Sequence, residues 1–172
     1  MPSTVRRPNL ETESYEQLFQ RFLNSIRLVA GSRQVEDAQR MIADIQREWQ
    51  RRRDRGDATL NYDRPEQGVL AALGYHVGHS QGQSSNTRRL ILKYLLEGGL
   101  PMIHSAIYMN EWGEPNSLKR FEKLVQFLGN MIEGNQMRPN SKLAVRQWRE
   151  DLEWVQNYHA HSSDEELVRR AD

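Results

Sequence analysis

The chain contains no cysteine among its 172 residues. This absence excludes disulfide bonds, thiolate chemistry and the usual cysteine-rich structural zinc sites, and it fits a reducing compartment. The sequence also lacks an apolar window of the roughly 18 to 20 residues that a membrane span needs. Its first residues, MPSTVRRPN, lack the apolar core of a secretory signal. We therefore expect a soluble cytoplasmic protein.

An excess of charge of one sign is missing too, because 24 lysines and arginines face 23 aspartates and glutamates, which gives a formal net charge of +1. A strong basic field over the whole chain, of the kind that attracts nucleic acid, is therefore excluded, and any anion site must be local. Hydrophobic residues make up 37% of the chain, which is enough for one core with long exposed helix faces.

Apolar residues recur at intervals of three and four along most of the chain, the spacing typical of amphipathic helices. Glycines, prolines and Ser, Thr or Asn caps divide this pattern into segments. The expected helices cover residues 14–30, 32–56, 65–77, 88–97, 101–110, 118–132 and 141–159. Because neither strand-like alternation nor an internal repeat is present, the sequence predicts an all-α fold, a compact bundle of about seven helices with a two-helix N-terminal segment.

Three segments are expected along the chain. Residues 1–64 form an N-terminal helical segment of two helices plus a linker, ATLNYDRP at 58–65, whose turn formers and proline interrupt the helical pattern. Residues 65–160 form a helical module. Residues 161–172 form a polar tail that is expected to be loosely attached.

The stretch GYHVGHSQGQSSNTRR, residues 74–89, places three glycines, two histidines and a polar run before an apolar helix. It lacks the Lys-Ser/Thr pair of a Walker motif, so a P-loop is not predicted. A hinge or helix-breaking loop is the first interpretation, because glycine lets the backbone turn. An anion site at the start of the next helix is the second, because free N–H groups, Thr87, Arg88 and Arg89 favour a phosphate there.

Metal binding is the third interpretation of this stretch. His76 and His79 lie three residues apart and His104 lies on a later helix, but no carboxylate stands at a fixed spacing and no HExxH motif is present. The neighbouring serines lack a nucleophile elbow, and Glu111 and Glu114 have no visible mate for acid–base chemistry. The sequence therefore predicts no catalytic residue, no metal site, no cofactor and no enzyme, with a hydrolase kept as the last of three functional hypotheses.

A second basic cluster, REWQRRRDRGD, ends the second expected helix. Adjacent guanidiniums of this kind can contact a phosphate backbone. Yet acidic residues are interleaved with them, and the helix dipole favours positive charge at a C-terminal end, so a solvated, self-paired helix end is the preferred interpretation. The candidate anion-binding or nucleic-acid-binding residues are Arg51, Arg52, Arg53, Thr87, Arg88 and Arg89.

Four tryptophans suggest core or interface anchors. Trp49 and Trp148 fall on apolar stripes, and Trp112 lies at a turn where it can staple two helices. Trp154 lies off the apolar stripe of its helix and is therefore available to a partner. The candidate interface residues are Trp112, Trp148 and Trp154.

Residues from about 68 to 155 carry several short motifs, of which W-G-x-P-x-S at 112–117 and W-x-x-D-L-x-W at 148–154 are the most characteristic. In these motifs the chain resembles a small helical module that recurs at the C-terminus of uncharacterised bacterial and phage proteins. The resemblance implies a prokaryotic or phage setting and an α-helical module, and it brings no activity and no catalytic residue with it.

Abundant amphipathic helices, four tryptophans and the lack of a catalytic constellation favour a non-enzymatic interaction protein. We expect an adaptor or regulator of a bacterial or phage assembly that self-associates or binds a protein partner. The alternative is a nucleic-acid-binding accessory factor that uses the two arginine clusters and whose binding weakens steeply as salt rises.

Overall fold

The computed structural model describes residues 9–56, 68–103 and 105–171, with side chains up to Ser162. These ranges hold seven α-helices, two short 3₁₀ helices and no strand, which confirms the predicted all-α fold. The helices are α1 (Tyr15–Ala30), α2 (Val35–Asp54), α3 (Val69–Ala72), α4 (Ser85–Glu97), α5 (Ala106–Glu111), α6 (Leu118–Asn135), α7 (Lys142–Ala171), η1 (Leu10–Thr12) and η2 (Pro139–Ser141). The expected linker at 58–65 and His104 lie outside the described residues.

The first two long helices form a hairpin. Ser14 begins α1 with a capping box, in which its hydroxyl accepts from the Gln17 N–H while the Gln17 side chain accepts from the Ser14 N–H. The apolar face of α1 then packs on α2, where the Trp49 ring lies 5.3 Å from the Phe19 ring and 5.2 Å from the Phe22 ring. This aromatic cluster holds the two helices of the N-terminal segment together.

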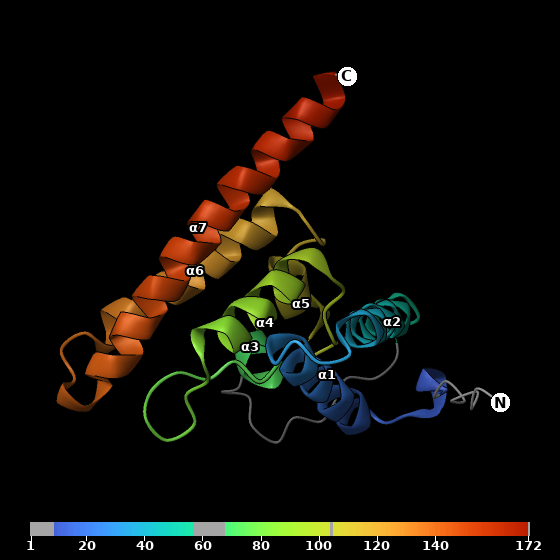
Figure 1. The fold of residues 1–172 in the computed structure, drawn as a ribbon, viewed down its shortest axis with the longest axis horizontal. Coiled ribbons are helices and arrows are strands. Elements are labelled where there is room, and N and C mark those ends of the chain that lie inside the picture. Colours follow the sequence, from blue (N-terminus) through green and yellow to red (C-terminus); the bar gives the residue numbers. More distant parts are fainter. Residues whose placement is uncertain (1–8, 57–67, 104, 172) are drawn as a thin grey trace.

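Helix α4 lies at the centre of the fold. It packs against α1 on one side and α7 on the other, and Figure 1 shows it between the N-terminal hairpin and the long C-terminal helices. Its residues Ile91, Leu92 and Leu95 are fully buried, as the apolar circumference of this segment predicts. One hydrophobic core runs from Leu18 in α1 to Val155 in α7.

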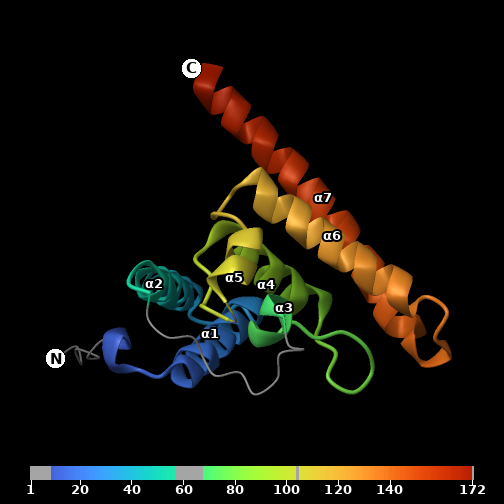
Figure 2. The same cartoon turned by 180° about the vertical axis from the view of Figure 1, so that it is seen from behind.

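The last two helices form a second hairpin, which Figures 1 and 2 show as two rods lying side by side. Leu124 and Leu128 of α6 are fully buried, and the Phe121 ring stacks on the His159 ring at 3.9 Å. Beyond this stack α7 continues past the start of α6 to Ala171. The expected helix end at His159 is therefore wrong, because the following residues include good helix formers and neither glycine nor proline.

Several other boundaries differ from the expected ones. Helix α4 begins at Ser85, three residues before the expected start at 88, and Ser84 caps it. Helix α2 covers Val35–Asp54 within the expected range of 32–56, and its N-cap, Gln34, has a left-handed conformation. The expected helix at 101–110 begins later, because the Ser105 hydroxyl accepts from the Tyr108 N–H and starts α5 there. Within the described part of the chain, no helix has the length and apolar character needed to cross a membrane.

Candidate functional site

The glycine-rich stretch forms a loop between α3 and α4. Gly74 and Gly78 have φ angles of +82° and +91°, a left-handed conformation that favours glycine. Gln83 closes the loop on itself, since its side-chain amide donates to the Gly74 carbonyl at 2.5 Å and accepts from the His76 N–H at 3.1 Å. The prediction of a helix-breaking loop is confirmed.

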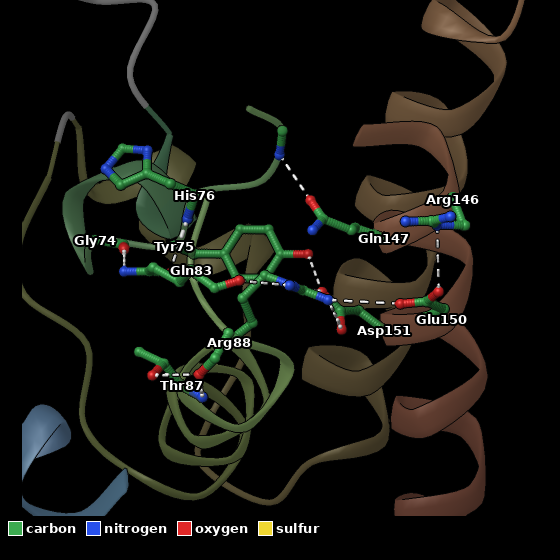
Figure 3. A network of polar contacts seen from close by, with 12 residues as sticks. Gly74, Tyr75, His76, Gln83, Thr87, Arg88, Arg146, Gln147, Glu150 and Asp151 are labelled. Atoms are coloured by element: carbon green, nitrogen blue, oxygen red, sulfur yellow. Dashed lines mark hydrogen bonds and ion pairs between the residues drawn. The ribbon is translucent and has the colours of Figure 1, made fainter. Parts of the chain in front are cut away.

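A buried polar network fastens this loop and α4 to α7 (Figure 3). The Asp151 carboxylate, fully buried on α7, accepts from the Tyr75 hydroxyl at 2.6 Å and from Arg88 Nε and Nη2 at 2.6 and 3.2 Å. Arg88 also donates to the Gln83 carbonyl at 2.7 Å, and the Gln147 side chain accepts from the Gly78 N–H at 2.7 Å. The loop and α4, which follow each other in the sequence, are therefore joined to the distant helix α7 at one carboxylate.

The electrostatics of this network favour its ion pair. Burial raises the pKa of the Tyr75 hydroxyl, and the negative charge of Asp151 raises it further, so the phenol stays a hydrogen-bond donor. For Arg88, burial is the largest influence and lowers the pKa, but the hydrogen bond to Asp151 and its charge outweigh burial and raise it. The network holds a fixed ion pair with a neutral phenol beside it.

The prediction that Arg88 binds an external phosphate is therefore wrong, because its side chain is only 2% exposed and is committed to Asp151. Thr87, half-buried in the first turn of α4, uses its own N–H and hydroxyl to contact the Ser84 hydroxyl at 3.2 and 3.0 Å. Arg89 is half-buried. The two arginines that the sequence places side by side thus do not form a common clamp.

The arginines at the end of α2 are largely engaged within the chain. Arg52 is buried and pairs with Glu48 at 2.7 Å, and it lies over the Tyr15 ring at 4.9 Å. Arg51 pairs with Glu11 and lies 3.2 Å from a Glu48 oxygen. This confirms a self-paired helix end for these two, although Arg52 is buried rather than solvated.

Arg53 differs from its two neighbours. Its guanidinium donates to the Asn110 side chain of α5 at 3.1 Å, and no acidic residue pairs with it in the described ranges. Of the three arginines predicted together, Arg53 is thus the one that points toward α5.

Two of the three tryptophans predicted to form an interface are core residues instead. Trp112 is fully buried and Trp148 is 8% exposed. Trp112 packs near Phe127, with ring centroids 6.4 Å apart, and so it staples α5 to α6 within the chain. Trp154 is half-buried and stacks on Tyr158 at 5.0 Å. Of the three, Trp154 has the most exposed side chain.

Arg120 of α6 was not singled out in the sequence, yet it is fully buried. It donates to the carbonyls of Leu95 and Gly98 at 3.1 and 2.5 Å and to that of Gly113 at 2.7 Å. The first two carbonyls lie at the C-terminal end of α4, where the helix dipole favours a cation. The sequence could have revealed this burial, because Arg120 lies four and eight residues before the buried Leu124 and Leu128 and therefore falls on the same apolar face of the helix.

The outer surface carries a groove between α5 and α6, with a volume of about 660 Å³. An ion pair crosses it, in which Lys123 Nζ lies 2.7 Å from a Glu111 oxygen, and this hydrogen bond and the charge of Lys123 lower the pKa of Glu111. One exposed apolar side chain, Ile107, lines the groove, and a second, Leu118, directly precedes the lining residue Lys119 in the sequence. The lining residues are Ile107, Asn110, Glu111, Lys119, Glu122, Lys123 and Gln126.

Several groups that were considered for metal binding and acid–base chemistry can be located in the structure. No cluster of three or more metal-ligating side chains occurs among the residues that the structure describes. His76 is half-buried and His79 is exposed on the loop. The carboxylate of Asp151 is enclosed and already accepts three hydrogen bonds, so it cannot take a proton from an outside molecule without breaking them. These hydrogen bonds fix the loop to α7.

Compared with known proteins, the chain matches no protein-family model, no curated protein and no solved structure.

Proposed function

We propose that this chain is a non-enzymatic helical interaction module that binds a protein partner at the α5–α6 groove. One observation carries the proposal: Ile107, which lines this groove, is 78% exposed, and Leu118, which directly precedes the lining residue Lys119 on α6, is 59% exposed. Isolated exposed apolar residues are ordinary, but two large ones beside one concave surface are typical of an interaction site.

The chemistry of the groove suggests the kind of partner. Its charged residues are of both signs, and two of them, Glu111 and Lys123, already pair with each other. The groove therefore needs no strongly charged ligand. A short amphipathic helix, with apolar side chains to cover Ile107 and Leu118 and polar ones at the rim, fits this surface.

The interior of the protein supports a binding role rather than an enzymatic one. The buried charged groups Arg88, Asp151, Glu48 and Arg52 are used in ion pairs within the chain, which is how a rigid scaffold is built. A setting in a bacterial or phage assembly, as an adaptor or regulator, is part of this proposal and follows from the sequence resemblance. The nucleic-acid alternative is weakened by the internal pairing of Arg51, Arg52 and Arg88.

The proposal is tested by site-specific photo-cross-linking. A photoreactive residue is placed at Ile107, at Leu118 and, as a control, at Met137, which is 88% exposed but lies beyond the other end of α6. We expect the same protein to cross-link from the first two positions and not from Met137. The substitution Ile107→Glu should weaken this cross-link at Leu118, whereas Met137→Glu should leave it unchanged.

The identity of the cross-linked species and its mass distinguish two forms of the proposal. A cross-linked dimer of this chain, with a dimer mass in solution, would assign the groove to self-association. A different protein at the same two positions would assign it to an adaptor role. Equal labelling from all three positions, or labelling that Ile107→Glu does not change, would contradict the proposal. Salt-sensitive binding of DNA or RNA in its place would favour the nucleic-acid alternative.

A further inference from the structure

The segment that joins the end of α6 to the first turns of α7 is basic. Residues 134–149 contain four basic residues, Arg138, Lys142, Arg146 and Arg149, and no acidic one. This segment alone carries a formal charge of +4, whereas the whole chain carries +1. The near-neutral charge of the chain therefore conceals a local basic region, and it is the local charge to which a polyanion responds.

Three of the four side chains lie on one face of α7. Lys142, Arg146 and Arg149 follow one another at steps of four and three residues, so they are neighbours along the helix surface. Val145 and Trp148, which lie between them in the sequence, are buried in the core. The three basic side chains are exposed and therefore point away from the core.

Arg138 is exposed in the turn that precedes this face, and the four basic residues together form what we call the α7 basic stripe. Figures 1 and 2 show the turn between α6 and α7 at the outer edge of the molecule. Gln136 and Asn140, in the same turn, are exposed as well. Side-chain amides contact phosphate oxygens beside lysine and arginine in protein–DNA interfaces, so these two residues suit the same ligand.

The charges of the α7 basic stripe are largely uncompensated. Among the residues that the structure describes, Arg138, Lys142 and Arg149 form no ion pair, and Arg146 lies 3.7 Å from a Glu150 oxygen. Lys142 is the first residue of α7, where the helix dipole disfavours a cation, and no acidic residue stands in this first turn. Neither ion pairing nor helix stability therefore explains why these charges are placed here.

We propose that the α7 basic stripe binds the phosphate backbone of a double-stranded nucleic acid without reading its sequence. Lys142 and Arg149 lie about 10 Å apart along the helix axis, the axial length that about three phosphates of one strand occupy. Contacts to phosphates position a protein on a duplex but carry no sequence information. The α5–α6 groove is lined from α6 by residues 119–126, whereas the stripe follows the other end of that helix, so the two surfaces are separate.

An anionic lipid surface fits the stripe less well. A basic helix that lies on a membrane buries an opposite face of large apolar side chains in the lipid. In α7 the opposite face, with Val145 and Trp148, is packed in the protein core. Met137 is the one large apolar side chain that is exposed in the turn before the stripe. The polar surroundings of the stripe therefore favour a nucleic acid.

The test is fluorescence anisotropy of labelled duplex DNA and duplex RNA of mixed sequence, titrated with the full chain at several salt concentrations. Four phosphate contacts predict that the affinity for DNA falls about a hundredfold between about 50 and 200 mM salt, a log–log slope of about −3 to −4. The stripe variant combines Arg138→Gln, Lys142→Gln, Arg146→Gln and Arg149→Gln, and it should bring the slope to between about −1 and 0. All four positions are exposed and glutamine is a good helix former, so this variant should keep the fold.

A matched control removes the same charge from the other end of the chain. It combines Arg21→Gln, Arg40→Gln, Arg47→Gln and Arg51→Gln, four exposed arginines that pair with acidic residues within the chain. This control should keep the steep salt dependence and change the DNA affinity by less than about threefold. Circular dichroism melts of both variants check that they are folded.

The two duplexes separate the two sources of the backbone. Similar affinity for both would assign the stripe to duplex phosphates in general, and a preference for one would assign it to that nucleic acid. Equal weakening by the two variants would overturn the proposal, because it would indicate general charge attraction. A stripe variant that binds like the wild type would overturn it as well. So would a wild-type protein that binds neither duplex, or that binds vesicles of phosphatidylserine and phosphatidylcholine instead.

Discussion

Replacement of Asp151 by asparagine is the sharpest perturbation of the buried network. The asparagine side chain would keep the size of the aspartate but would leave Arg88, which is 2% exposed, without its buried counter-charge, with only the half-exposed Glu150 3.8 Å away. Removing one partner of a buried ion pair costs about 3 to 5 kcal/mol. Because a domain of this kind has about 5 to 15 kcal/mol of total stability, this single substitution should remove a large part of it.

The assay is urea unfolding followed by circular dichroism at neutral pH. With a slope of about 2 kcal/mol per molar urea, D151N should lower the midpoint by about 1.5 to 2.5 M. Glu150→Gln is the matched control on the preceding residue, because Glu150 lies 3.8 Å from Arg88 and its side chain is 47% exposed. This control should cost no more than about 1 kcal/mol.

Two further variants keep the test informative if D151N fails to fold. Tyr75→Phe removes one hydrogen bond to the carboxylate and should cost about 1.5 to 3 kcal/mol while leaving the ion pair. The double variant Arg88→Met, Asp151→Leu removes both charges and should be far less destabilised than D151N. A D151N midpoint within about 0.3 M of the Glu150→Gln midpoint would refute the reasoning.

The remaining predictions concern pH and glycine. Since the folded-state pKa of Tyr75 is raised above its ordinary value near 10, its contribution to stability is complete below about pH 10 and declines above it. The free-energy difference between wild type and Tyr75→Phe should therefore shrink in urea unfolding above about pH 10, and a constant difference would contradict this. Gly74→Ala should destabilise by about 1 to 3 kcal/mol, because φ is +82° and the new Cβ would overlap Leu23 Cδ2. Gly129→Ala, inside α6 with no atom within 4 Å of the new Cβ, should stabilise the protein by about 0.5 to 1 kcal/mol. Thermal melts in which both substitutions shift the melting temperature in the same direction would contradict these two glycine predictions.

The helical fold could be predicted from the sequence because its signal is local. The three-and-four spacing of residues such as Leu18, Phe22 and Ile26 requires no knowledge of distant contacts, and these side chains are fully buried. Helix ends were less predictable, because a cap depends on which of several neighbouring hydroxyls turns toward the free N–H groups. Ser84 rather than Thr87 caps α4, although both hydroxyls lie at the same turn.

The partners of the charged side chains could not be predicted from the number of charges in each cluster. Arg88, Arg52 and Arg53 looked alike as members of basic clusters, but their partners are Asp151, Glu48 and Asn110, which lie at very different separations along the chain. Only the partner four residues away was visible in the sequence. The contacts that decide whether an arginine is available to a ligand are long-range, and they depend on how the helices pack.

A register argument would have recovered part of this information. Arg88 lies on the same face of α4 as the buried Ile91, Leu92 and Leu95, and Asp151 lies between the buried Trp148 and Val155 on α7. Charges of opposite sign on the buried faces of two helices need each other, because neither can be left alone in the interior. Arg120, in the same register as Leu124 and Leu128, has no such acidic mate among the described residues. It donates instead to the carbonyls of Leu95, Gly98 and Gly113, so a buried arginine at a core position can be satisfied by backbone acceptors as well as by an acidic mate.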